Sequence, residues 1–167
     1  MFIGGFVHRP NVDAMKWFCK EILPEIRRNG VNDIFYIIGS NPNEEIHRLT
    51  ADGIEVVGYV SDKELEAFYR KCRLAVIPLR YGARMKGKLL EAMYNGMPVV
   101  TTSIGVEGLI DYEECIEVED DAVKFAKTVI WVIKDVEYAK QLSQKAQEYI
   151  RENFNEVKFE SCLDGYI

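Results

Sequence analysis

A run of basic side chains ahead of a predicted helix is the part of this sequence best suited to chemistry. Residues 71–90 contain no Asp or Glu, and their six cations are Lys71, Arg73, Arg80, Arg84, Lys86 and Lys88. The run reaches a helix that is predicted to begin near Gly87. Backbone N–H groups and the helix dipole favour an anion at such a position, and basic side chains add charge. The stretch therefore predicts a site for a small phosphorylated ligand, although a solvated basic surface would give the same charge run.

The composition is that of a soluble globular protein. The chain has 167 residues, of which 48% are hydrophobic and 29% charged, and we expect one domain over residues 1–167. A net charge of -6 argues against nucleic-acid binding. We expect a cytoplasmic protein, since no signal peptide precedes the first predicted strand and no apolar stretch is long enough for a bilayer. Four cysteines lack metal-site spacing and are expected to be reduced thiols: Cys19, Cys72, Cys115 and Cys162.

Short apolar runs alternate with segments of helical periodicity. Strands are predicted at residues 2–7, 33–38, 54–57, 74–77, 99–101 and 116–118. One apolar helix face is predicted over residues 15–26, and Ser61 and Glu64 fit a capping box. This order predicts a Rossmann-like fold, a doubly wound parallel sheet in three α/β/α layers. Ligands of such sheets bind beyond the carboxyl ends of the strands, where residues 79–86 are expected to lie.

Several other kinds of site are not supported. The first strand is not followed by a Gly-x-Gly-x-x-Gly turn, and the sequence contains neither a Walker-type loop nor a Gly-x-Ser-x-Gly elbow. Two distant histidines make a zinc site implausible. Because Lys and Arg can supply the positive charge, we expect neither a metal nor another cofactor.

Residues 79–100 resemble the nucleotide-sugar-binding segment of group 1 (family 4) glycosyltransferases with the GT-B fold. The resemblance is carried by a helix entered through a Gly-containing loop, a Glu-Ala pair, a Gly-x-Pro-Val-Val stop and a later Gly/Glu loop, here Glu91, Ala92, residues 96–100 and residues 105–108. Residues 2–5, 10–14 and 58–61 are similar to other segments of the same domain, so nearly the whole chain is covered. GT-B enzymes have two Rossmann-like domains, and the resemblance implies the C-terminal, donor-binding half without the N-terminal acceptor domain.

The resemblance also assigns roles to individual residues. It implies that Glu91 binds the ribose hydroxyls, since a carboxylate accepts two hydrogen bonds from a vicinal diol. It implies that basic residues neutralise the diphosphate of the leaving group, and Lys86 is our first choice, before Lys88 and Arg84. The remaining expected ligand contacts come from Gly5, His8, Tyr59, Val60 and Gly82.

Two positions depart from the family pattern. Many members carry a second Glu eight residues before the helix Glu, where this chain has Ala83. Many also carry an Arg and a Lys on the loop after the first strand, where Gly5 and the pair Pro10 and Asn11 stand here. We expect His8, Arg9 or the basic segment 84–88 to compensate.

The expected function is that of a metal-independent, hexosyltransferase-like enzyme. It would transfer a sugar from a UDP-, GDP- or other NDP-sugar to an acceptor hydroxyl with retention, and turn over weakly or not at all without its acceptor domain. The resemblance places such enzymes in polysaccharide biosynthesis, with peripheral membrane association for the full-length enzyme only.

Two alternatives remain open at this point. A non-catalytic interaction or regulatory module of the receiver type would need acidic residues after the first and third strands, where Phe6, Val7 and Gly58 stand. A degenerate transferase domain that only binds partners is favoured by Ala83.

Overall fold

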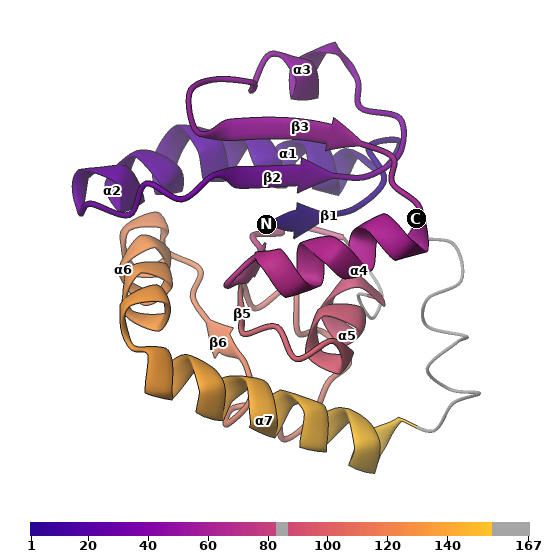
Figure 1. Ribbon diagram of the computed structural model, residues 1–167, viewed down its shortest axis with the longest axis vertical. Coiled ribbons are helices and arrows are strands. Elements are labelled where there is room, and N and C mark those ends of the chain that lie inside the picture. Colours follow the sequence, from indigo (N-terminus) through magenta and orange to yellow (C-terminus); the bar gives the residue numbers. More distant parts are fainter. Residues whose placement is uncertain (83–86, 155–167) are drawn as a thin grey trace.

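The computed structural model describes residues 1–82 and 87–154. Its strands are all parallel and form two three-stranded sheets, in the orders β1-β2-β3 and β4-β5-β6 (Figure 1). The strands are β1 (Phe2–Ile3), β2 (Phe35–Ile38), β3 (Ile54–Gly58), β4 (Ala75–Ile77), β5 (Val99–Thr101) and β6 (Glu117–Val118). The predicted strands are thus confirmed, except that the first ends at Ile3 instead of residue 7, because the chain turns at Phe6 and Val7.

Hydrogen bonds join the two sheets at β1 and β4. The amino group of Met1 donates to the Leu74 carbonyl at 2.7 Å, and the Val76 N–H donates to the Met1 carbonyl at 2.9 Å. The resulting order is β3-β2-β1-β4-β5-β6, which is the doubly wound arrangement that the sequence predicts.

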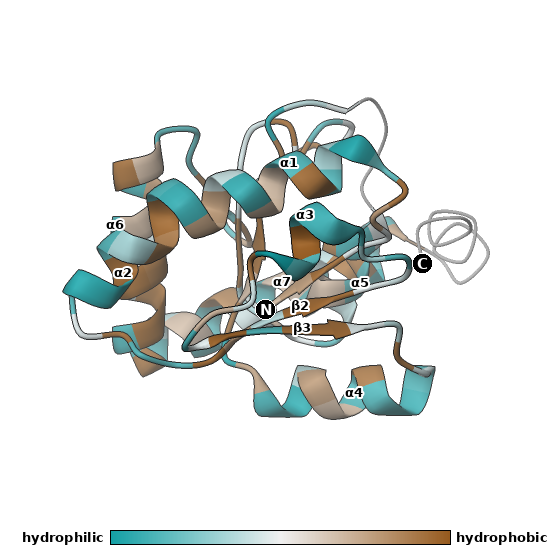
Figure 2. Cartoon of the chain, turned by 90° about the horizontal axis from the view of Figure 1, so that it is seen from above, coloured by the Kyte–Doolittle hydropathy of each residue, from teal (hydrophilic) through white to brown (hydrophobic). Residues whose placement is uncertain are grey.

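Helices cover both faces of the strands. They are α1 (Arg9–Trp17), a π-helical turn η1 (Phe18–Ile22), α2 (Leu23–Arg28), α3 (Glu44–His47), α4 (Asp62–Lys71), α5 (Gly87–Tyr94), α6 (Ala122–Lys134) and α7 (Val136–Asn153). Figure 2 shows α1 and α3 on one side of β2 and β3, and α4 on the other. The three-layer prediction is therefore confirmed.

The helix predicted over residues 15–26 is interrupted by the π-helical turn. Pro24 lies two residues after this turn and has no N–H to donate to the preceding helical turn. A wider turn accommodates the missing bond and keeps Phe18 and Ile22 buried on the same face. The apolar face was predicted correctly, and the local geometry was not.

The core is made of aromatic and aliphatic side chains between the helices and the sheet. The rings of Phe18 and Phe35 lie 4.6 Å apart, and Phe125 of α6 meets Phe18 edge to face. Tight caps set the directions of the helices around this core. Ser61 and Glu64 form the predicted capping box of α4, and Gly96, at φ 70°, ends α5 as predicted.

In the part of the chain that the structure describes, no helix has the length and apolar character needed to cross a membrane.

Candidate functional site at the carboxyl edge of the sheet

Loops that carry most of the expected ligand contacts meet at one edge of the sheet. Because the strands are parallel, their carboxyl ends lie at the same edge. Gly5 follows β1, Tyr59 and Val60 follow β3, and Gly82 lies in the loop after β4. Helix α5 begins at this edge too and carries Lys88 in its first turn.

Gly4 and Gly5 follow β1 and lead into a turn at Phe6 and Val7, and we call residues 4–7 the glycine turn. The Gly4 N–H donates to the Ile38 carbonyl at 3.0 Å, which holds the turn against the end of β2. A Cβ at Gly4 would lie only 2.8 Å from both Lys88 Nζ and Asn11 Nδ2. Glycine at this position therefore allows the side chains of α1 and α5 to approach the backbone.

Lys88 is a buried cation beside the glycine turn. Its side chain comes from α5, the residue is 7% exposed, and Nζ donates a hydrogen bond to Asn11 Oδ1. The Asn11 amide in turn donates to the Gly5 carbonyl at 2.7 Å. The ammonium also lies 4.9 Å from the ring centroid of Phe2. An ammonium group is thus fixed at the end of β1, where a phosphate would meet backbone amides and positive charge together.

Glu91 lies three residues after Lys88, so the two side chains are neighbours along α5. Glu91 Oε2 and the Tyr69 hydroxyl are the two buried side-chain oxygens without a hydrogen-bond partner in the described part of the chain. Burial, and then the charge of Asp62, raise the pKa of the Glu91 carboxyl to about 7. An unpartnered carboxylate oxygen can accept a hydrogen bond from a ligand hydroxyl.

The other expected contact residues line the same edge more loosely. His8 is exposed at the N-cap of α1, and its side chain makes no capping bond. Tyr59 is 69% exposed, and Val60 is half-buried. Gly82 has a φ of 128°, a conformation that L side chains rarely adopt. Arg84 and Lys86 lie outside the described residues, as does Ala83.

The prediction of one patch formed by the cationic run is wrong for three of its members. Lys71 and Arg73 precede β4 and lie at the amino edge, where Lys71 Nζ lies 4.4 Å from the Tyr36 ring centroid. Arg73 pairs there with Asp33 at 3.0 Å.

Arg80 lies after β4, and its guanidinium makes two hydrogen bonds with the Asp13 carboxylate, at 2.9 and 2.6 Å. This pair ties the loop after β4 to α1 instead of offering a free cation. Lys88 is the member of the run that the described residues bring to the glycine turn.

Sequence reasoning missed the parts played by Asn11 and Tyr69. Asn11 was noted only as a departure from the family pattern, whereas the structure places it between the glycine turn and Lys88. Tyr69 lies on the buried, otherwise apolar face of α4 and is 8% exposed. A hydroxyl on an otherwise apolar face was the available signal.

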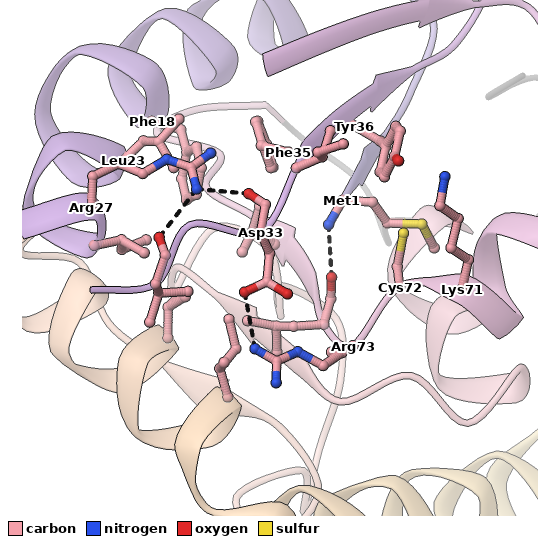
Figure 3. Close-up of a pocket in the computed structure, with 17 residues that line it drawn as sticks. Met1, Phe18, Leu23, Arg27, Asp33, Phe35, Tyr36, Lys71, Cys72 and Arg73 are labelled. Carbon is pink, nitrogen blue, oxygen red and sulfur yellow. Dashed lines mark hydrogen bonds and ion pairs between the residues drawn. The ribbon is translucent and has the colours of Figure 1, made fainter. Parts of the chain in front are cut away.

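An apolar pocket of about 260 Å³ lies at the opposite, amino edge of the sheet (Figure 3). Phe18, Phe35 and Leu74 are among its walls. The polar groups on its rim bond to each other: Arg73 pairs with Asp33, and the Arg27 guanidinium donates to the Asp33 carbonyl at 2.7 Å. Neither Lys88 nor Glu91 lines this pocket, and we therefore do not consider the pocket to be the functional site.

Comparisons with known proteins support the same family. A family model described as "Glycosyl transferases group 1" matches residues 1–135. An uncharacterized 44.6 kDa protein from the cps region of Klebsiella pneumoniae is 30% identical over 171 residues, which cover 98% of this chain and 44% of that protein. The chain spans less than half the length of the curated relatives it matches.

Solved structures share the fold at low sequence identity. HepE of Anabaena, solved in complex with UDP and glucose, superposes with a TM-score of 0.69 at 18% identity, over 96% of this chain and 46% of HepE. The C-terminal domain of LpcC, a group 1 family glycosyl transferase from Francisella tularensis, has a TM-score of 0.69 at 15% identity, over 93% of this chain and 85% of that domain. The second comparison matches this chain to a nearly complete single domain.

Proposed function

Because this chain belongs to the group 1 glycosyltransferase family, we propose that it is the nucleotide-sugar-binding half of such an enzyme. One observation carries the proposal. A buried ammonium and an unpartnered carboxylate oxygen lie one helical turn apart on α5, at the carboxyl edge of a doubly wound sheet. The two groups have the charges that a diphosphate and a ribose diol require.

The diphosphate lies at the glycine turn in this proposal, with Lys88 as its main cation. Lys88 takes the leading role that the sequence had suggested for Lys86, because its ammonium is held by Asn11 beside Gly5. A fixed positive charge in a shielded place stabilises the negative charge that develops on a leaving diphosphate. Lys86 and Arg84 stay predicted phosphate contacts.

The nucleoside extends from the glycine turn along α5. Glu91 accepts hydrogen bonds from the ribose hydroxyls, and the base lies against the backbone at Tyr59 and Val60. That HepE was solved with UDP supports a uridine nucleotide as the first ligand to test.

The reaction proposed is glycosyl transfer from an NDP-sugar, with retention at the anomeric carbon. The acceptor hydroxyl oxygen forms a bond to that carbon, the bond from that carbon to the diphosphate oxygen breaks, and the hydroxyl proton passes to the released diphosphate or to solvent. Since an ammonium group supplies the charge at the leaving group, we propose that no metal is needed. The cps-region origin of the Klebsiella relative supports polysaccharide assembly as the setting.

The acceptor is held by a second domain in this proposal. The matched relatives are more than twice as long as the aligned part of this chain, which supports an acceptor-binding partner domain. We expect nucleotide binding by this chain alone, and weak or no transfer without that domain.

Isothermal titration calorimetry with UDP and GDP tests the ribose assignment. We expect Glu91→Gln to weaken binding about 10–100-fold, because an amide replaces charge-assisted acceptors with weaker ones. Glu148→Gln, an exposed position on α7, serves as the matched control and should bind as the unmodified chain does. If the unmodified chain binds neither nucleotide, the proposed function is wrong, and an interaction module becomes the better interpretation.

A further inference from the structure

Two buried oxygens without hydrogen-bond partners lie on α4 and α5. They are the Tyr69 hydroxyl and Glu91 Oε2, and no other buried side-chain oxygen or nitrogen in the described part of the chain lacks a partner. Burial, and then the Glu91 charge, raise the pKa of the Tyr69 hydroxyl. No hydrogen bond joins the two groups in this structure.

A tyrosine at this position lowers the stability of the folded chain unless its hydroxyl forms a hydrogen bond. A buried hydroxyl without a partner destabilises the folded state, and phenylalanine would fill the same space without that cost. Tyr69 is 8% exposed and packs on the inner face of α4, so water does not offer an easy alternative partner. A buried donor and a buried acceptor that both lack partners indicate a hydrogen bond that forms only when a third group, a ligand, occupies the site.

The third group is supplied by the nucleotide. A carboxylate that accepts two hydrogen bonds from a ribose diol has to be ionised, whereas burial and the nearby Asp62 oppose ionisation of Glu91 in the empty site. A protein donor on a remaining lone pair would offset that opposition. Tyr69 is the buried hydroxyl available for this purpose.

We propose that Tyr69 is a positioning residue that donates a hydrogen bond to the Glu91 carboxylate when a ribose diol occupies the site. The hydroxyl holds the carboxylate in its ionised form and in the orientation that both ribose hydroxyls need. This inference rests on the proposed function, because the occupant of the Glu91 site is the ribose of a nucleoside diphosphate.

Tyr69→Phe removes only the hydroxyl and separates binding from stability. We expect this variant to bind UDP about 10-fold more weakly. Its melting temperature without ligand should equal or exceed that of the unmodified chain, because an unsatisfied group is lost. In a Glu91→Gln background, Tyr69→Phe should cause no further loss of affinity, since the hydroxyl acts through the carboxylate.

Tyr149→Phe is the matched control, because Tyr149 is also 8% exposed but its hydroxyl already donates to the Ile110 carbonyl at 2.8 Å. Its loss should lower the melting temperature by roughly 2–4 °C and leave UDP affinity unchanged. Calorimetry and thermal unfolding of the single and double variants provide the measurements.

The results separate the two proposals. If UDP binds, Glu91→Gln weakens binding and Tyr69→Phe binds as tightly as the unmodified chain, the role of Tyr69 is wrong and the ribose assignment stands. A melting temperature of Tyr69→Phe that falls as in Tyr149→Phe would also overturn the inference, since it would reveal a satisfied structural hydroxyl. If the unmodified chain binds no nucleotide, both proposals fail.

Discussion

Lys88 differs from the surface cations of this chain in the way it is held. Arg48 and Arg70 pair with glutamates on their own helices while remaining largely exposed, and such pairs contribute little to stability. Lys88 is buried instead, and a neutral amide accepts its hydrogen bond. The Asn11 amide holds the ammonium beside the glycine turn.

Moving the ammonium from α5 to α1 tests this arrangement. We expect Lys88→Met to weaken UDP binding about 10–100-fold, because the main cation at the diphosphate is lost. Adding Asn11→Lys to this variant should restore much of the affinity, since the new ammonium would reach the glycine turn from α1. Calorimetry at low and high salt is the measurement, and the salt dependence should fall with Lys88→Met and return in the double variant.

Lys140→Met, an exposed position on α7, controls for the loss of one charge. Unchanged UDP affinity in Lys88→Met would contradict the assignment. Failure of the rescue alone would show that the ammonium must approach from α5.

At the scale of the elements, the glycine turn determines how closely β1, α1 and α5 approach. Gly4→Ala would place a methyl group 2.8 Å from Lys88 Nζ and Asn11 Nδ2. Both are the ends of side chains and can move, so we expect a small loss of stability. The displaced ammonium should cost roughly 10-fold in UDP affinity, which calorimetry and urea denaturation would measure together.

Gly30→Ala is a useful comparison for that variant. Gly30 has a φ of 82° with no atom within 4 Å of an added Cβ, and it follows α2, away from the glycine turn. We expect a loss of about 1 kcal/mol in stability from backbone strain and no change in UDP binding. Equal affinities of the two variants would contradict a specific role for Gly4.

The elements were predictable because their signals are local. Continuous apolar runs mark strands buried on both faces, and the capping box of Ser61 and Glu64 follows directly from residue types. The π-helical turn before Pro24 was not predictable to the same degree, because proline removes a hydrogen bond without specifying how the helix adapts.

The site was predictable only in part, for a reason of geometry. A strand carries the chain from one edge of a sheet to the other, so Arg73 before β4 and Lys88 in α5 lie at opposite edges although they are close in sequence. Asn11 and Lys88 show the converse, since 77 positions separate two residues in direct contact. A linear charge run reveals neither fact, whereas the motif around Glu91 located the correct helix.

At the scale of the whole molecule, the site affects how stability depends on pH. The pKa of Glu91 in the folded chain is about 7, above its ordinary value of 4.5, mainly because of burial and then because of Asp62. Between about pH 4.5 and pH 7, Glu91 keeps its proton in the folded chain and loses it in the unfolded chain. The free energy of unfolding therefore decreases as the pH rises through this range.

Glu91→Gln should remove this part of the pH dependence. We expect the variant to match the unmodified chain near pH 4 and to be more stable by about 1–2 kcal/mol at pH 8, the smaller end allowing for the partial exposure of the residue. Urea denaturation across that range, with Glu148→Gln as control, measures the difference. Parallel curves for Glu91→Gln and the unmodified chain would contradict the raised pKa.

The contact between Asn11 and Lys88 links helices that accompany the two different three-stranded sheets. A chain in which only one of the two sheets has folded would therefore not bring Lys88 to Asn11 and the glycine turn. A nucleotide bound at this contact would stabilise the folded chain, in which the two sheets are joined, and so protect it from proteolysis.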